Sequence, residues 1–156
     1  MRKTNRRCIR FMRYRSYVQY MRYLPVLSVL FFLLGNCSVF KPKFDPVGHQ
    51  YAVTIKQEAL VLMDKAGESF SLHRDEVYLL MTRVEMAYEN ARLKYKNDAA
   101  TGIWDVIRSP GANQLARFMQ DWEKEDILGA AYINEAKKLL QENFDILIKI
   151  EESKKK

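Results

Sequence analysis

Apolar residues recur at steps of three or four through four stretches of the chain, and this spacing constrains the fold more than any other feature. In residues 50–66 and 72–96 the repeating positions are Ala52, Ile55, Ala59, Leu62 and Ala66, and then Val77, Leu80, Val84, Ala87 and Ala91. In residues 110–125 and 126–153 they are Leu115, Phe118, Met119 and Trp122, and then Ile133, Ala136, Leu140, Phe144 and Leu147. Each set falls on one face of a helix, so each stretch predicts an amphipathic helix. In the second stretch Leu79, Met81, Met86 and Tyr88 widen the apolar face.

Turn residues separate these predicted helices. Gly67 is a natural stop for the first helix, and Ser109-Pro110 is typical of an N-cap followed by proline at the first helical position. Residues 99–108 are less regular, but Trp104 and its apolar neighbours predict a short helical turn that packs against the other helices. Because short connections favour antiparallel neighbours, the sequence predicts an all-α fold: a single up-and-down bundle of about four helices, with that helical turn between the second and third.

The chain before the bundle begins with a basic segment and continues with a short apolar run. Residues 1–36 hold eight of the 26 basic residues and no acidic residue, and Leu24 to Leu34 is uncharged. This run of 11 residues is too short for a bilayer-spanning helix, which needs about 20 apolar residues, but has the length of a secretory signal. Residues 38–48 contain Pro42 and Pro46 without periodicity and predict a short extended tether.

Residues 21–38 resemble the export signal of bacterial lipoproteins. Leu34 stands three residues before Cys37 and Gly35 is small, as in that pattern, whereas Asn36 departs from the small residue usual before the cysteine. The resemblance implies cleavage between Asn36 and Cys37, with a diacylglycerol and an acyl chain attached to Cys37. The predicted organisation is a signal peptide at 1–36, with Met21 as an alternative start, a lipidated cysteine and tether at 37–48, and a helical domain at 49–156. For the helical domain no family resemblance is recognised.

Two alternatives to the processed lipoprotein remain open at this point. The uncharged stretch reaches Phe40 and has 17 residues, so an uncleaved signal anchor is one alternative. Cleavage without lipid attachment is the other. In a Gram-negative cell the lipoprotein would lie in the outer membrane and face the periplasm, because Ser38 is not the aspartate typical of inner-membrane retention. The processed lipoprotein and the uncleaved anchor place the protein at the bacterial cell envelope, whereas cleavage without lipid gives a freely diffusing exported protein.

Charge and cysteine content exclude several classes of protein. The formal net charge of +7 comes from residues 1–36, since the other 18 basic residues face all 19 acidic residues. The domain therefore lacks the basic footprint of a nucleic-acid-binding protein. Cys8 and Cys37 are the two cysteines, so the domain has none available for a disulfide. His49 and His73 are the two histidines and lack metal-ligand spacing, which predicts no metal site.

The sequence predicts a non-enzymatic protein without a cofactor. Its carboxylates lie at helix ends or on polar faces, and no catalytic motif surrounds its serines or histidines. The expected function is to present the helical bundle to a protein partner, whose amphipathic segment would enter an apolar cleft between two helices. The alternative is a module that binds a small ligand or a lipid. The candidate partner or ligand surface consists of four aromatic residues: Trp104, Phe118, Trp122 and Phe144.

Lys156 is a second candidate contact. The murein lipoprotein also ends in a lysine, and that lysine is joined to peptidoglycan. The resemblance is limited to the terminal lysine and the lipid-anchored helical plan, and it implies a peptidoglycan contact through Lys156.

Overall fold

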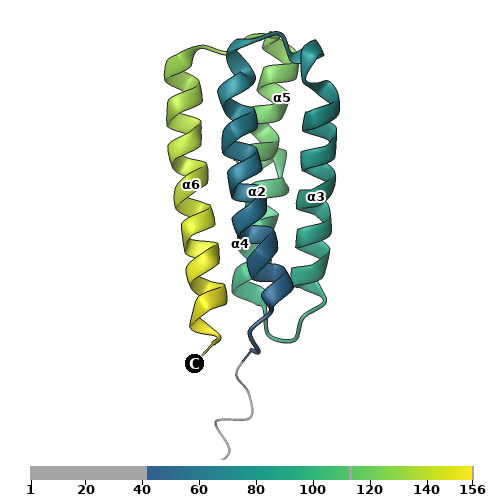
Figure 1. The fold of residues 1–156 in the computed structure, drawn as a ribbon, viewed down its shortest axis with the longest axis vertical. Coiled ribbons are helices and arrows are strands. Elements are labelled where there is room, and N and C mark those ends of the chain that lie inside the picture. Colours follow the sequence, from purple (N-terminus) through teal and green to yellow (C-terminus); the bar gives the residue numbers. More distant parts are fainter. Residues whose placement is uncertain (1–41, 113, 156) are drawn as a thin grey trace, which may run out of the picture. The chain divides into compact units, whose positions relative to one another are not determined.

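The computed structural model describes residues 42–112 and 114–155, and these residues contain α-helices and no strand (Figure 1). The helices are α2 (Pro46–Asp64), α3 (Arg74–Arg92), α4 (Asp98–Arg108), α5 (Leu115–Glu125) and α6 (Ala130–Ser153). Three short 3-10 turns connect them: η2 (Lys65–Gly67), η3 (Phe70–Leu72) and η4 (Pro110–Ala112). The prediction of an all-α bundle is confirmed.

The helices form four columns, and one column consists of two helices. Figure 1 shows α2 and α3 side by side, α6 on the other side of α2, and α4 and α5 following one another behind α2. The chain rises through α2, descends through α3, rises again through α4 and α5, and descends through α6. This is the predicted up-and-down order.

The segment expected to be a short helical turn, residues 99–108, is a full helix of 11 residues. It forms because Ala100, Trp104 and Ile107 share one face, which is buried against the neighbouring helices. The helix ends before Pro110, whose ring and missing N–H oppose a continuous helix. Pro110 opens a 3-10 turn rather than a long helix, and α5 begins only at Leu115. The break splits the third column into two helices.

The start of α2 also differs from the prediction. The helix begins at Pro46, so residues 46–48 belong to the bundle and not to an extended tether. Asp45 is the N-cap, and its carboxylate accepts a hydrogen bond from the backbone N–H of Val47 at 3.1 Å. Proline is well suited to the first helical position because the N–H groups there have no intrahelical partner. A proline after an aspartate therefore starts this helix.

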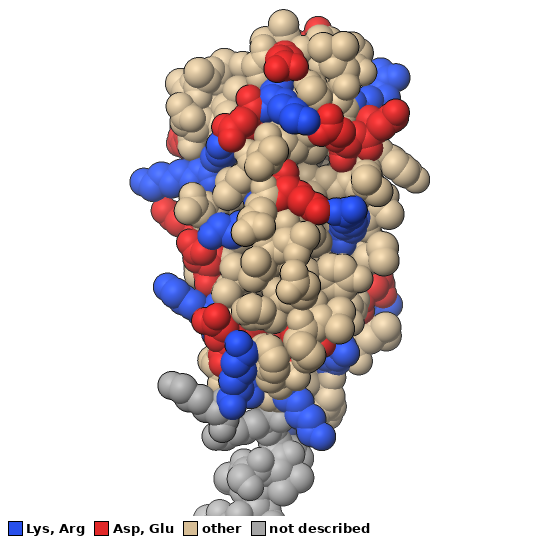
Figure 2. Space-filling model, viewed as in Figure 1, with Lys and Arg blue, Asp and Glu red and all other residues tan. Residues whose placement is uncertain are grey.

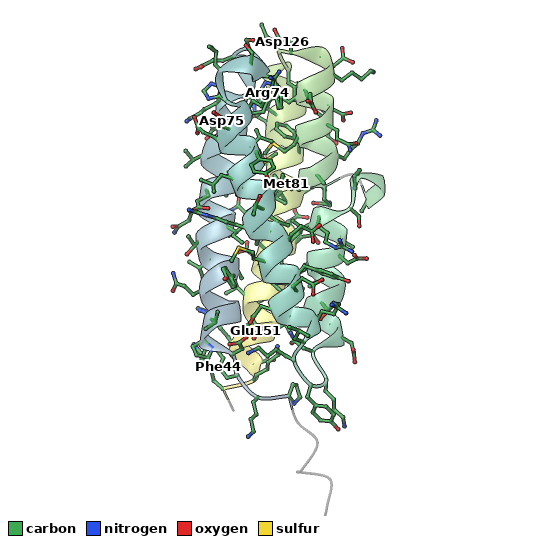
Figure 3. The ribbon with its side chains drawn as sticks, turned by 90° about the vertical axis from the view of Figure 1, so that its right-hand side faces the viewer. Phe44, Arg74, Asp75, Met81, Asp126 and Glu151 are labelled. Carbon is green, nitrogen blue, oxygen red and sulfur yellow. The ribbon has the colours of Figure 1, made fainter. Side chains whose placement is uncertain are left out.

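Two ends of the bundle can be distinguished. The tether end comprises residues 42–45, the α3–α4 connection (residues 93–97) and the end of α6, and the distal end comprises the α2–α3 and α5–α6 connections. Figure 3 shows Phe44 and Glu151 at the tether end and Arg74, Asp75 and Asp126 at the distal end. Left-handed backbone at Lys96 (φ 55°) and Asp126 (φ 65°) turns the chain in these connections. Helix α3 ends four residues before its predicted end, and α6 begins four residues after its predicted start.

Candidate functional site

The four aromatic residues that sequence reasoning selected as a surface are core residues. Trp104, Phe118, Trp122 and Phe144 are each at most 2% exposed. The ring of Trp104 packs edge-on against Phe144 with 5.7 Å between centroids. Because they are buried, these four side chains do not form an exposed surface. The physical reason for Trp104 is that α4 is a regular helix, whose apolar face turns the indole inward.

The buried side chain of Trp122 also has its polar group hydrogen-bonded inside the fold. Its indole N–H donates to two backbone carbonyl oxygens, those of Glu68 at 3.0 Å and Asp126 at 3.1 Å. Of the four aromatic residues Phe118 alone lines a described cavity, which has a volume of about 170 Å³ between α5, α6 and Met63. The other three fill the core rather than enclose a ligand site.

A larger hollow lies on the surface between α2 and α3, and we call it the α2–α3 groove. Its volume is about 630 Å³. It is lined from α2 by Pro46, Val47, Gln50, Tyr51, Thr54 and Ile55, and from α3 by Leu79, Thr82, Arg83 and Met86. Figure 2 shows a mostly uncharged surface where the lower halves of α2 and α3 meet. The groove is a mostly apolar concave surface that two helices build together.

Small residues are common among the buried positions of the two helices that form the groove. The buried positions of α2 and α3 include Ala52, Ala59, Ala87 and Ala91. Three larger apolar residues of the same helices are about half exposed: Val47 at 52%, Leu79 at 54% and Met86 at 53%. The sequence contained a signal for this site, since Leu79 and Met86 belong to the residues that widen the apolar face of the second predicted helix.

Polar contacts hold both ends of the groove. At the tether end the carboxylate of Asp45 accepts a hydrogen bond from Asn90 Nδ2 at 2.9 Å and lies 3.4 Å from Lys94 Nζ. Burial acts to raise the pKa of Asp45, but the hydrogen bonds from Asn90 and Gly48 and the charge of Lys94 outweigh it and lower the pKa. Toward the distal end Arg83 of α3 pairs with Glu58 of α2. The two walls of the groove are therefore joined at each end.

At the distal end His73 contacts two glutamates and a core tryptophan. His73 is 9% exposed, and its ring nitrogens lie 3.1 Å from Glu76 and 2.9 Å from Glu68. The hydrogen bond to Glu68, followed by that to Glu76, raises the pKa of His73. The imidazole lies 5.6 Å from the indole of Trp122, so this ion pair fastens the η3 turn onto the core.

Two acidic residues on different helices, Glu85 of α3 and Asp121 of α5, each pair with an arginine. Glu85 pairs with Arg108 at 3.1 Å, and Asp121 pairs with Arg117 at 2.9 Å. Asp121 also accepts a hydrogen bond from Tyr132 at 2.7 Å. Burial, and then this hydrogen bond, raises the pKa of Tyr132 to about 12. Within residues 42–112 and 114–155, no three His, Cys, Asp or Glu side chains are grouped so that they could hold a metal ion.

Asn36, Cys37 and Lys156 lie outside the described residues, so the lipidation, cleavage and peptidoglycan predictions stay predictions. None of the described helices is both long enough and apolar enough to cross a membrane. The chain matches no known protein-family model, and it has no significant match among curated proteins or solved structures.

Proposed function

We propose that this protein is a non-enzymatic lipoprotein of the bacterial cell envelope that presents its helical bundle to a protein partner through the α2–α3 groove. The observation that carries the proposal is the groove itself, which combines half-exposed Val47, Leu79 and Met86 in one concave surface. Contiguous exposed apolar surface of this kind is typical of sites where another molecule binds.

The shape of the groove favours a helical segment as its occupant. The α2 wall runs from Pro46 to Ile55, which at 1.5 Å per residue is about 14 Å, or two to three helical turns. An amphipathic helix with apolar residues at i, i+3 or i+4, and i+7 offers a matching ridge. Gln50, Thr82 and Arg83 line the groove with hydrogen-bonding groups that would orient such a segment. This is the helix-in-groove mode of recognition.

The export signal supports the envelope location. Leu34, Gly35 and Cys37 follow the lipoprotein pattern, and lipid on Cys37 would anchor the bundle to a membrane. In a Gram-negative cell this is the outer membrane, with the bundle facing the periplasm. A contact of Lys156 with peptidoglycan remains part of the proposal, and digestion with lysozyme should then change the mobility of the protein.

A small apolar ligand or a lipid is the second candidate occupant of the same groove. The observation that favours it is the volume of about 630 Å³, which lies within the range of small-molecule sites. The two candidates differ in what a covalent cross-link from the groove would capture, a protein or a small molecule.

The anchor is tested by the intact mass of the protein extracted from a membrane fraction of its native host. A mass equal to Cys37–Lys156 with three acyl chains would support the proposal. A mass that begins at Met1 or Met21 would show an uncleaved anchor, and a mature mass without lipid would show a freely exported protein. Either of the last two results would overturn the lipoprotein assignment.

The groove is tested by photo-cross-linking in the native host with a photoreactive amino acid in place of Thr82, which is exposed and lines the groove. We expect a cross-linked protein that is lost when Leu79→Gln and Met86→Gln are combined. Val61→Gln and Ile146→Gln are matched controls, because both residues are exposed and apolar but do not line the groove. A cross-link that survives in the groove variant would contradict the proposal, and a cross-linked small molecule would favour the second candidate.

A further inference from the structure

The connection between α3 and α4 exposes a run of basic and apolar side chains at the tether end. Arg92, Leu93, Lys94, Tyr95 and Lys96 are consecutive, and each of them is exposed. Leu93 is 76% exposed, although a leucine loses favourable burial energy there. After α3 has ended at Arg92, the positive φ of Lys96 turns the chain toward α4. This mixture of lysines, leucine and tyrosine is typical of surfaces that meet a membrane interface.

Buried polar contacts fix this connection to the rest of the tether end. Asn97 donates to the backbone oxygen of Ala91 at 3.1 Å and accepts from Lys154 of α6. Lys154 also pairs with Glu151 at 2.6 Å, and both side chains are nearly inaccessible to solvent. These contacts link the ends of α3 and α6. The exposed residues of the connection therefore belong to one rigid surface rather than to a loose loop.

Other residues of the tether end extend this surface. Lys43 and Lys155 are exposed, and the Nζ atom of Lys155 lies 4.7 Å from the centre of the Phe44 ring. Within one helical turn of this end the exposed acidic residues are Glu89, Asp98 and Glu152. Glu89 pairs with Arg92 at 2.7 Å, and Glu152 lies 3.5 Å from His49. Figure 2 shows Lys and Arg side chains at the lowest described part of the molecule, and others higher on the same face.

The distal end has the opposite charge. Its exposed acidic residues are Asp64, Glu68, Asp75, Glu76, Glu123, Glu125 and Asp126. Its exposed basic residues are Arg74 and Lys124. An anionic surface therefore attracts the tether end and repels the distal end, which orients the bundle with its axis away from that surface.

The chain length before the bundle places the tether end next to the proposed anchor. Cys37 precedes Pro42, the first described residue, by five residues. Five residues span at most about 18 Å in any conformation. A lipid on Cys37 would thus keep Leu93, Tyr95 and the surrounding lysines within reach of the lipid headgroups.

We infer that the tether end of the bundle is a second membrane-contact surface, which binds anionic lipid headgroups through its lysines and inserts Leu93 and Tyr95 at the interface. The inference rests on the proposed function for the position of the anchor. It goes further by assigning an orientation: the bundle stands on its tether end, so the α2–α3 groove opens sideways above the membrane. The occupant is a bilayer that contains an anionic phospholipid such as phosphatidylglycerol.

The test uses the full protein, purified with its lipid and reconstituted in vesicles. An environment-sensitive fluorescent amino acid replaces Leu93 in one variant and Leu72 in a matched control, since Leu72 is 70% exposed but lies at the distal end. We expect a blue-shifted emission, quenched by bromolipids, only for position 93 and only in vesicles with phosphatidylglycerol. Equal signals at both positions, or equal signals in pure phosphatidylcholine vesicles, would overturn the inference.

Charge-reversal variants test whether the contact of the tether end with the bilayer depends on attraction between its lysines and the anionic headgroups. Because each lysine near an anionic surface contributes roughly a fivefold factor in affinity, the K94E/K96E variant should lose most of the signal at position 93. Lys124→Glu at the distal end is the control and should leave it unchanged. A protein mass without acyl chains would overturn the proposed anchor. Mixed with the same vesicles, that protein would still show whether the tether end binds anionic lipid, so the two claims fail separately.

Discussion

The helices α4, α5 and α6 and the pair α2 and α3 have similar apolar sequence patterns, but they differ in how fully their apolar side chains are buried. Where α4, α5 and α6 meet, Trp104, Phe118, Trp122 and Phe144 fill the space between the helices. In α2 and α3 four of the ten buried residues are alanine, and Leu79 and Met86 remain half exposed beside a groove. The buried residues of these two regions, the closed and the open side, thus differ in side-chain size, and short side chains fill less of the space between helices.

Ion pairs also distinguish the α2–α6 interface from the α2–α3 groove. Lys56 of α2 reaches Asp145 of α6 at 2.5 Å, and Lys137 of α6 pairs with Asp64 of α2. Between Asp45 and Glu58, the α2–α3 groove instead has an apolar floor and polar contacts at its ends. The α2–α6 seam is thus crossed by charged side chains, whereas the groove is left accessible to a partner.

The largest expected effect is at the closed side. Phe144→Ala removes a fully buried ring that packs against Trp104, and we expect a loss of about 3–5 kcal/mol in the free energy of unfolding. Urea denaturation followed by circular dichroism measures this loss. A loss below about 1 kcal/mol would mean that the aromatic core can collapse around the cavity, and the contrast with the groove side would no longer hold.

A smaller effect is expected at the tether end of the open side. Asp45→Ala removes the N-cap of α2 and the contact with Asn90, which we expect to cost about 1 kcal/mol of unfolding free energy. Because the folded pKa of Asp45 lies below the unfolded value of 3.8, this contribution is present above pH 3.8 and is lost as the pH falls through the folded pKa. Denaturation of both proteins across this range should show the two stabilities converging in acid. Asp75→Ala, an exposed acidic residue in the first turn of α3, is the matched control.

The contribution of His73 to stability should change with pH in the opposite direction from that of Asp45. Its folded pKa is raised above 6.5 by Glu68 and Glu76, so its contribution is complete below pH 6.5 and is lost as the pH rises through the folded pKa. The stability difference between the wild type and His73→Gln should therefore shrink as the pH is raised. Thermal unfolding on both sides of this range measures it. A difference that grows with pH would show that His73 is held neutral against Trp122 instead.

The smallest effect is expected in the groove. The combined Leu79→Gln and Met86→Gln variant changes two half-exposed side chains, so its unfolding free energy should stay within about 0.5 kcal/mol of the wild type. The urea midpoint measures this. Stability that falls by several kcal/mol would show that these residues belong to the core, and the comparison between an open and a closed side would fail.

Particular residues show how far sequence reasoning reached. The alternation of three and four placed Val77, Leu80 and Val84 on the buried face of α3 correctly, because a helix repeats its faces regardless of its surroundings. Trp104 was expected in a short helical turn within the less regular residues 99–108, whereas the segment is a full helix of 11 residues with a buried indole. Local propensity is a weak signal there, and packing against α3 and α6 outweighs it.

The candidate site was the less predictable part. Sequence reasoning anticipated an apolar cleft between two helices, but assigned it to the largest aromatic residues. The structure buries those residues and exposes Val47, Leu79 and Met86 instead. Asp45 and Pro46 were assigned to a tether, although together they cap and begin α2. For the apolar residues the decisive neighbours lie on other helices, whereas Asp45 caps α2 through Val47, two positions away.

The sequence by itself determined that the domain at 49–156 is built from amphipathic helices, because helical periodicity and capping depend on neighbours within a few positions. It also determined the charge distribution, with the excess of basic residues in the first 36 positions. The tertiary structure alone decided which apolar side chains are interior and which line the α2–α3 groove, and that α4 and α5 share one column. The reason is that burial depends on the size of the side chains that meet from different helices, and a one-dimensional pattern does not contain those distances.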